Sequence, residues 1–285
     1  MQPDHIEREL VYWGVLSKQL SEFYADWSKK PDEELEWILE TCSEKSRAAL
    51  KTLDEASIGP VDSVLEVGCG YGKNLRDAMD VTGASVGVGT DFSEAAIAIA
   101  KERFGDSNTT FLHTPSLSIE KAAAVIRETH SDAFDLVLLF DLLEHIPRPK
   151  RFMRTLGSMG KHFLIKLPLE NSVYDNYLSL RRKTYPSSRH PDGHLREFHV
   201  DSVHAFVTSL GFTPLSSDCY AYASALLYPQ HAMPKNPASR LYHEAEKRMK
   251  AVCKAILPKR LFLRLIGGGG FVCLATWSED HILDE

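Results

Sequence analysis

The residues best suited to chemistry lie at a bend where an apolar run meets three closely spaced glycines. The segment 64–72 reads VLEVGCGYG, with glycine at three alternate positions. Glycine lets the main chain adopt conformations that side chains forbid, and it lets a ligand lie against the backbone. Glu66 stands two residues before the first glycine. A carboxylate there would repel a pyrophosphate and attract a cation, so the bend is predicted to bind a cationic amino group.

The glycine spacing and a second carboxylate narrow the choice of ligand. Dinucleotide-binding turns use G-x-G-x-x-G, whereas this chain has G-x-G-x-G, which disfavours a nicotinamide cofactor and an oxidoreductase. The segment 85–91 reads SVGVGTD and places Asp91 at the end of a second apolar run. A carboxylate there can accept hydrogen bonds from both hydroxyls of a ribose. A nucleoside that carries a cationic amino group is therefore predicted to bind here.

Further polar groups follow a third apolar run. The segment 134–147 reads FDLVLLFDLLEHIP, so Asp141, Glu144 and His145 follow a strand that is expected to be buried. A histidine at the rim of a site can act as a general base, and His145 is the first candidate. The alternative for His145 is a structural role in shaping the pocket.

A second candidate base lies farther along the chain. His194 opens the segment HLRE, in which Glu197 is its candidate partner. The two side chains could form a catalytic pair, or a hydrogen bond within a loop.

These groups need a scaffold that brings the ends of several strands together. From residue 61 onward, apolar runs that favour strands alternate with helical periods. The predicted strands are 64–67, 85–88, 110–112, 134–140, 162–167 and 271–277, and the clearest predicted helices are 95–104, 119–129 and 201–210. This alternation predicts an α/β fold with a parallel sheet covered by helices on both faces. Ligands bind at the carboxyl ends of such strands.

The segments around this core have different patterns. Apolar residues recur at helical spacing in residues 1–58, which predicts an N-terminal cap of two helices before a core domain of residues 59–285. Residues 168–199 mix tyrosines, basic residues and histidines, and they are predicted to form a lid.

A basic helical insertion is predicted at residues 235–264. Nine lysines and arginines and two glutamates give it a charge of +7, and because the whole chain carries −6, the remainder carries −13. Apolar residues recur along the insertion at helical spacing. The segment is therefore either a solvated helix or a weak contact with a membrane surface.

The composition excludes several classes of function. The 285 residues have a net charge of −6, so the chain lacks the basic excess that suits nucleic-acid binding. Its five cysteines do not have the spacing of metal ligands, which predicts reduced thiols, no metal site and a cytoplasmic protein. No stretch approaches the ~20 apolar residues of a transmembrane helix, so no integral membrane span is expected. The oligomeric state stays open.

Taken together, the motifs resemble class I S-adenosylmethionine-dependent methyltransferases, in particular the small-molecule group that includes the ubiquinone-biosynthesis O-methyltransferases. The resemblance covers residues 61–170 well and residues 194–212 loosely. It implies a Rossmann-like sheet of seven mostly parallel strands, with the last strand antiparallel and inserted beside the fifth.

The resemblance also implies an activity. The expected reaction is methyl transfer from S-adenosylmethionine to a small-molecule acceptor, on the oxygen of a hydroxyl or a carboxylate. Nitrogen or carbon acceptors, and a non-catalytic S-adenosylmethionine-binding module, stay open as alternatives.

The resemblance assigns roles to individual residues. Glu66, Gly68 and Gly70 are expected to line the methionine part of the cofactor, Asp91 to hold the ribose, and Phe92 to lie beside the adenine. Leu142 and His145 are expected near the sulfonium. The full set of expected cofactor-binding residues is Glu66, Gly68, Cys69, Gly70, Asp91, Phe92, Ser116, Asp141 and Leu142.

The chain departs from the family in one place. Relatives usually carry an acidic residue after the third strand that bonds the adenine amino group. The corresponding segment 111–117 reads FLHTPSL and contains no carboxylate. Adenine is then expected to be held by the backbone, Thr114, Ser116 or stacking.

Overall fold

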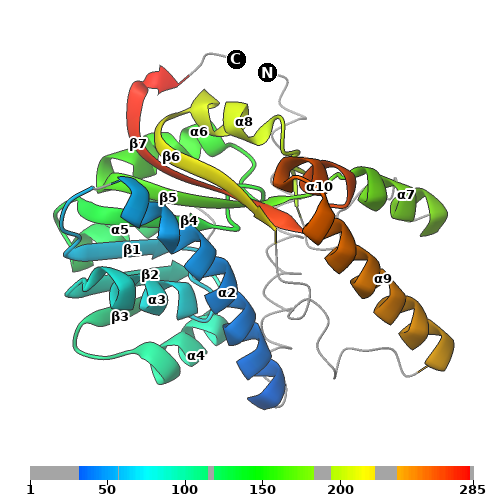
Figure 1. Ribbon diagram of the computed structural model, residues 1–285. Coiled ribbons are helices and arrows are strands. Elements are labelled where there is room, and N and C mark those ends of the chain that lie inside the picture. Colours follow the sequence, from blue (N-terminus) through cyan, green and yellow to red (C-terminus); the bar gives the residue numbers. More distant parts are fainter. Residues whose placement is uncertain (1–31, 57, 115–118, 183–193, 222–235, 283–285) are drawn as a thin grey trace, which may run out of the picture.

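A seven-stranded sheet forms the centre of the protein (Figure 1). The computed structural model describes residues 32–56, 58–114, 119–182, 194–221 and 236–282. The strands are β1 (Ser63–Val67), β2 (Val86–Asp91), β3 (Thr109–His113), β4 (Phe134–Phe140), β5 (Gly160–Leu169), β6 (Leu210–Ala221) and β7 (Gly269–Ile282). Their order across the sheet is β3-β2-β1-β4-β5-β7-β6.

The strand directions confirm the predicted topology. Strands β1 to β5 pair in parallel, whereas β7 runs antiparallel between β5 and β6. The parallel connections carry helices, as crossovers between parallel strands require. The carboxyl ends of β1, β2, β4 and β5 therefore share one rim of the sheet.

Both faces of the sheet are buried beneath helices, because its central strands are apolar on both sides. In β4, Leu136 and Leu138 pack into one cluster while Val137 and Leu139 pack into the other. The first cluster is covered by α2 (Asp32–Ala56), α3 (Lys73–Thr82) and α4 (Glu94–Phe104). The second is covered by α5 (Ile119–Thr129), α6 (Pro149–Leu156) and α8 (Val203–Ser209).

Helix α2 is part of the predicted N-terminal cap, and its second half packs into the core of the sheet. Ala49 and Leu50 lie in the same buried cluster as β1 and α3. The hydroxyls of Ser43 and Ser46 both donate to Asp77 of α3, at 2.8 and 2.9 Å. The earlier predicted helix lies outside the described residues, and the division at residue 58 stays a prediction.

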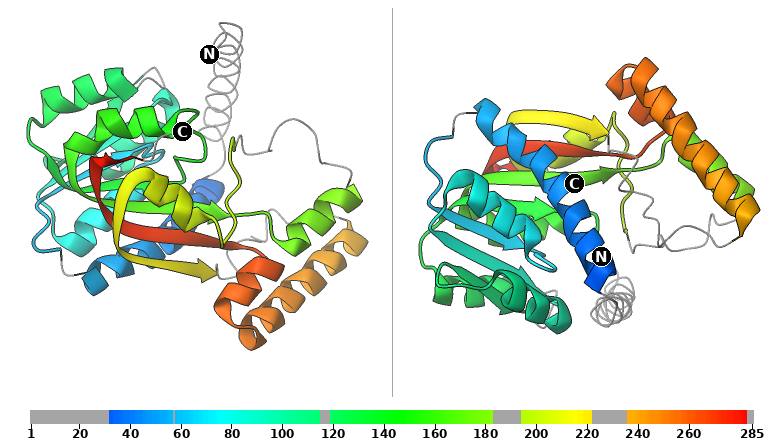
Figure 2. Two further views of the ribbon diagram at one scale, coloured as in Figure 1. Left: turned by 90° about the horizontal axis from the view of Figure 1, so that it is seen from above. Right: turned by 60° about the horizontal axis from the view of Figure 1, so that its bottom comes forward.

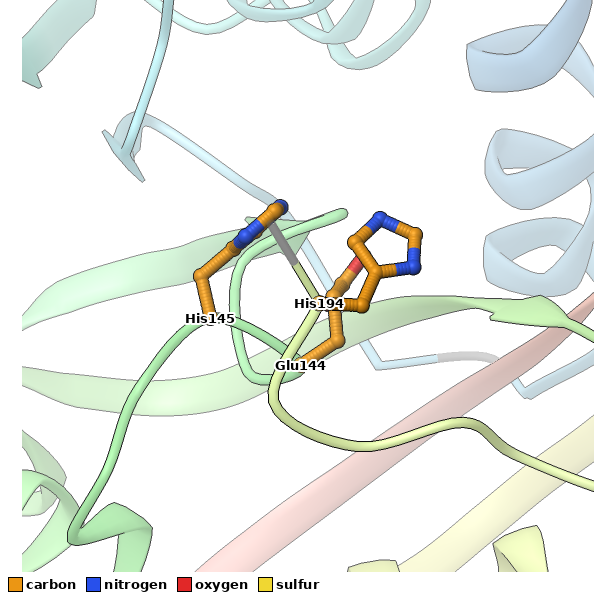
Figure 3. Close-up of side chains that lie close together, drawn as sticks. All are labelled: Glu144, His145 and His194. Atoms are coloured by element: carbon orange, nitrogen blue, oxygen red, sulfur yellow. The ribbon is translucent and has the colours of Figure 1, made fainter. Parts of the chain in front are cut away.

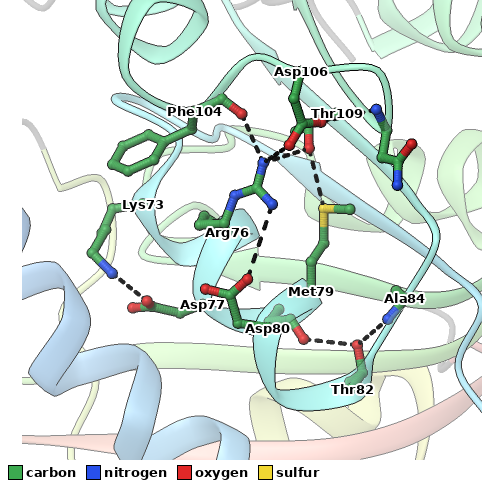
Figure 4. Close-up of polar contacts among 12 residues, drawn as sticks. Lys73, Arg76, Asp77, Met79, Asp80, Thr82, Ala84, Phe104, Asp106 and Thr109 are labelled. Atoms are coloured by element: carbon green, nitrogen blue, oxygen red, sulfur yellow. Dashed lines mark hydrogen bonds and ion pairs between the residues drawn. The ribbon is translucent and has the colours of Figure 1, made fainter.

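Arg76, in the first turn of α3, links this helix to the connection between α4 and β3 (Figure 4). Its guanidinium donates to the Phe104 carbonyl at 2.8 Å, to Asp106 at 2.6 Å and to the Thr109 hydroxyl at 2.8 Å. Since α3 begins directly after the glycine-rich bend, this network helps to hold the bend in place.

Three helices gather beyond the end of β5 (Figure 2). They are α7 (Val173–Arg182), α9 (Pro237–Ile256) and α10 (Lys259–Leu265). Helix α10 packs against β7 through the buried Phe262 and Leu263. Helix α7 belongs to the predicted lid, of which residues 183–193 lie outside the described part. The predicted basic insertion forms α9 and α10. No helix in the described ranges combines the length and apolarity needed to cross a bilayer.

Candidate active site

The glycine-rich bend leaves β1 in a conformation that requires glycine. Gly68, Gly70 and Gly72 have φ angles of +80°, +49° and +81°, in the left-handed region. A Cβ at Gly72 would lie 2.7 Å from the ring of Phe111, so this glycine serves packing. A Cβ at Gly70 would meet no atom of the described residues within 4 Å. The space beside Gly70 is therefore open to a ligand.

Asp91 joins the end of β2 to this bend. One carboxylate oxygen accepts from the main-chain N–H of Gly70 at 2.9 Å, and the other accepts from that of Ser93 at 2.8 Å. The side chain is buried, and this burial raises the pKa of Asp91 despite the two hydrogen bonds. Each oxygen retains a second acceptor position, so the carboxylate can also bind a pair of ribose hydroxyls.

Glu66 lies on the same rim and is fully buried. The Asn74 amide donates to one of its oxygens at 3.2 Å, while the other has no hydrogen-bond partner among the described residues. Burial raises the pKa of Glu66 to about 8. A buried carboxylate oxygen without a partner is costly, and a cationic amino group would satisfy it. Glu66 therefore fits the predicted ligand.

A cleft opens beside the bend. Asp91 and Thr114 line its polar edge, and the predicted residues Phe92 and Leu142 line its apolar wall. Sequence reasoning missed further apolar lining residues, because helical periodicity marks them only as core: Ile119, Ala122, Ile146 and Phe152. Apolar walls with few polar groups suit a planar base. Ser116 lies outside the described residues.

Cys69 contributes to the bend through its main chain. Its N–H donates to the Thr90 carbonyl at 2.9 Å. The thiol is turned into the core, where it would lie 3.0 Å from a Cβ built on Gly89, and burial raises its pKa. The predicted role in cofactor binding can therefore involve only the backbone of this residue.

Asp141 lies at the end of β4 with a φ of +47°, which is unusual for a residue other than glycine. Its carboxylate accepts a hydrogen bond from the ammonium of Lys166, and its main-chain N–H donates to the Lys166 carbonyl at 3.0 Å. Lys166 is buried in β5. Burial works against its charge, but Asp141 and nearby groups raise its pKa to about 12. The pair fixes the loop that carries Leu142.

Glu144, His145 and His194 come together beyond this loop (Figure 3). The two imidazole rings meet edge to face, with centroids 4.8 Å apart. The main-chain N–H of Leu195 donates to the Glu144 carbonyl at 2.9 Å, which brings the His194 segment to the β4 loop. Both predicted bases therefore lie at one place on the rim.

The carboxylate that pairs with His194 is Glu170 rather than Glu197. His194 Nδ1 lies 2.9 Å from Glu170, which directly follows β5. Glu197 is exposed. A carboxylate that accepts from Nδ1 fixes the tautomer of the ring and makes Nε2 the basic nitrogen.

Glu144 has the least satisfied side chain of this cluster. It is fully buried, and neither of its carboxylate oxygens has a hydrogen-bond partner in the described part of the chain. Burial, with Asp141 as a second cause, raises its pKa to about 8. One ligand atom each of Glu144, His145 and His194 lie within 4.8 Å of one another. Such a cluster can share a proton or hold a divalent cation.

Known proteins resemble this chain in both sequence and fold. A family model described as "Methyltransferase domain" matches residues 27–217. Ubiquinone biosynthesis O-methyltransferases are 32% identical over 112 residues in Hahella chejuensis and 36% identical over 98 residues in Azoarcus sp., which is 39% and 34% of this chain. The matched region spans only 44% and 39% of the length of these relatives.

A solved structure shows the same fold. A chain in the complex between the Haloferax volcanii Trm112 methyltransferase activator and a methyltransferase superposes with a TM-score of 0.57 at 15% identity, covering 89% of this chain and 97% of that one. The family match includes the glycine bend, Asp91 and the histidine cluster. The chain thus belongs to the methyltransferase domain family.

Proposed function

We propose that this enzyme methylates a hydroxyl oxygen of a small-molecule acceptor, with His194 as the general base and Glu170 as its orienting partner. The observation that carries the proposal is the 2.9 Å contact between His194 Nδ1 and Glu170 at the rim of the sheet. A carboxylate acceptor is already ionised and needs no base, whereas a hydroxyl must lose a proton. An oriented histidine therefore favours a hydroxyl acceptor.

Different residues of the chain bind the cofactor and remove the proton of the acceptor. Bound S-adenosylmethionine supplies a methyl group that its sulfonium already activates. The glycine bend, Glu66 and Asp91 hold the cofactor and leave the acceptor side of the rim open. Alignment of the two reactants can supply roughly 7–11 kcal/mol of the barrier. His194 Nε2 removes the hydroxyl proton, and Glu170 stabilises the imidazolium that forms.

The preference between the two predicted bases rests on their partners. His194 has a carboxylate on its Nδ1, while His145 lies against the His194 ring and next to the buried Glu144. His145 is therefore proposed to shape the acceptor pocket. The sequence alone favours the opposite order, since it does not reveal Glu170.

The test is turnover with a panel of small phenols, alcohols and carboxylates, measured as S-adenosylhomocysteine formed. His194→Gln is expected to lower kcat by about 10²–10⁴-fold. The Kd for S-adenosylhomocysteine should stay within about twofold, because His194 does not line the cofactor cleft. His204→Gln, an exposed histidine on α8, is the matched control and should behave as wild type.

Three results would contradict the proposal. Turnover only on carboxylates would remove the need for a base. A greater loss in His145→Gln than in His194→Gln would reverse the assignment. Loss of activity on dialysis against EDTA, restored by a divalent cation, would assign Glu144, His145 and His194 to a metal and contradict the metal-free expectation from the sequence.

A further inference from the structure

Helix α9 presents its apolar side to solvent. Its large apolar residues form one stripe, in which Leu241, Val252 and Ile256 are 73%, 58% and 71% exposed. Tyr242 and Met249 belong to the same stripe and are also exposed. These positions fall within about 100° of one another at 100° per residue, so they share one face of the helix. The stripe, from residue 241 to residue 256, is about 22 Å long.

The side of α9 that faces the protein is polar. Glu246 is buried, and its carboxylate lies 3.0 Å from the ammonium of Lys250. That ammonium lies 5.4 Å from the ring centroid of Tyr174 on α7. A surface helix of a globular protein usually buries its apolar stripe and exposes its charges. In α9 this arrangement is reversed, so burial within the described fold does not explain the stripe.

Helix α9 carries more basic than acidic residues, with Arg248 and Glu244 both next to the Leu241 edge of the stripe. The segment 235–264 carries +7 against −13 for the remainder of the chain. Of the two acidic residues on α9, Glu246 is buried beside Lys250. Arg240, Arg248 and Lys254 are exposed. Helix α9 thus combines an exposed apolar stripe with an excess of basic residues, of which Arg248 adjoins the stripe.

The apolar stripe and the basic residues together favour one of the surfaces that could cover α9. Lys259, Arg260 and Arg264 are paired with Asp218 and Asp201, but α9 itself keeps a positive charge, so the α9 helices of two copies would repel. A bilayer with anionic headgroups offers an apolar interior for the stripe and negative charge for the basic residues. We propose that α9 lies in the surface of an anionic phospholipid bilayer, with Leu241, Met249, Val252 and Ile256 of its stripe inserted among the lipid chains.

The position of α9 in the chain agrees with a role separate from catalysis. The helix lies between β6 and β7, beyond residue 217, where the family match ends. It lies beside α7, and only its last turns reach the sheet, where the Lys254 ammonium donates to the Ala221 carbonyl of β6 (Figure 2). The proposal does not depend on which acceptor the enzyme methylates.

The test is co-sedimentation of the full chain with phosphatidylcholine vesicles, with and without one quarter phosphatidylglycerol. The wild type is expected to bind the anionic vesicles, and the doubly substituted Leu241→Glu/Val252→Glu protein to lose at least tenfold in affinity. Val81→Glu/Leu215→Glu is the matched control, because these residues are similarly exposed (55% and 47%) on α3 and β6. The control should bind as wild type, and both variants should keep their affinity for S-adenosylhomocysteine.

The contribution of charge is tested separately. Arg240→Gln and Arg248→Gln should each weaken binding to anionic vesicles by about fivefold, the equivalent of about 1 kcal/mol per basic residue. Absence of wild-type binding, or equal binding by the stripe variant, would overturn the proposal. A wild-type dimer that the stripe variant converts to a monomer, seen by light scattering without vesicles, would assign the stripe to a second copy instead.

Discussion

The two sides of the site's rim satisfy their polar groups in different ways. At the ends of β1 and β2, the carboxylate of Asp91 accepts main-chain hydrogen bonds from Gly70 and Ser93. At the ends of β4 and β5, the contacts are between side chains from distant segments, as with His194 and Glu170. Backbone geometry thus defines the cofactor side, while the acceptor side depends on side chains that substitution can change without altering the fold.

The largest expected effect is on the cofactor side. Asp91→Ala removes the acceptor for the main-chain N–H groups of Gly70 and Ser93 and, in the proposed binding mode, for the ribose hydroxyls. Hydrogen bonds to charged groups contribute about 1.5–3 kcal/mol each, so the Kd for S-adenosylhomocysteine should rise by about 10²-fold or more. Calorimetry measures this, with the exposed Asp80→Ala as the control. If Asp91→Ala binds S-adenosylhomocysteine as the wild type does, main-chain contacts at the ends of β1 and β2 do not define the cofactor side.

Substitutions at two glycines of the bend should distinguish an effect on ligand binding from an effect on stability. Gly72→Ala forces a Cβ against Phe111 and should lower the free energy of unfolding by about 1–3 kcal/mol. Gly70→Ala meets no atom in the described part of the chain, so it should cost only about 1 kcal/mol of stability while weakening cofactor binding about tenfold or more. Urea unfolding and calorimetry on both variants check this. If both variants lose the same affinity for the cofactor, the cofactor does not occupy the space beside Gly70.

On the acceptor side, Lys166 is the residue whose loss should affect stability most. Lys166→Met leaves the Asp141 carboxylate without its buried cation. Because Asp141 is 37% exposed and can be hydrated, the expected cost is about 1–3 kcal/mol, below that of a fully buried pair. Adding Asp141→Asn should restore part of the loss. Additive losses in the double variant would show that the pair does not couple.

The smallest effect is a dependence on pH. The pKa of Glu66 is raised to about 8 by burial, above its value of 4.5 in the unfolded chain. Its contribution to stability without ligand is therefore complete below pH 4.5 and is lost as the pH rises towards 8. Since a cationic amino group prefers the carboxylate, cofactor affinity should rise over the same interval, with release of protons.

Calorimetry in buffers of different ionisation enthalpy measures this proton release. The Glu66→Gln variant should release fewer protons and bind the cofactor more weakly. If the affinity of the wild type for S-adenosylmethionine stays constant from pH 6 to pH 8, the raised pKa of Glu66 is contradicted.

The sequence predicts the cofactor side better than the acceptor side for a physical reason. The glycine bend, Glu66 and Asp91 are specified by short contiguous segments, and sheet topology places strand ends together. The pairing of His194 with Glu170, 24 residues away, depends on the path of the chain between them. Lys166 lies in an apolar strand, where its burial beside Asp141 is invisible to periodicity. Likewise, periodicity reveals the apolar stripe of α9 but not that it faces outward.

The place of β7 constrains how the sheet is assembled. Among the described strands, β6 touches the sheet only through β7, which pairs with β5 on its other edge. During synthesis β6 therefore emerges before the strand it must pair with, and α9 and α10 emerge between them. The early strands can form a nucleus on the ribosome, but closure of the β5-β7-β6 edge joins segments far apart in the chain, the kind of contact that slows folding.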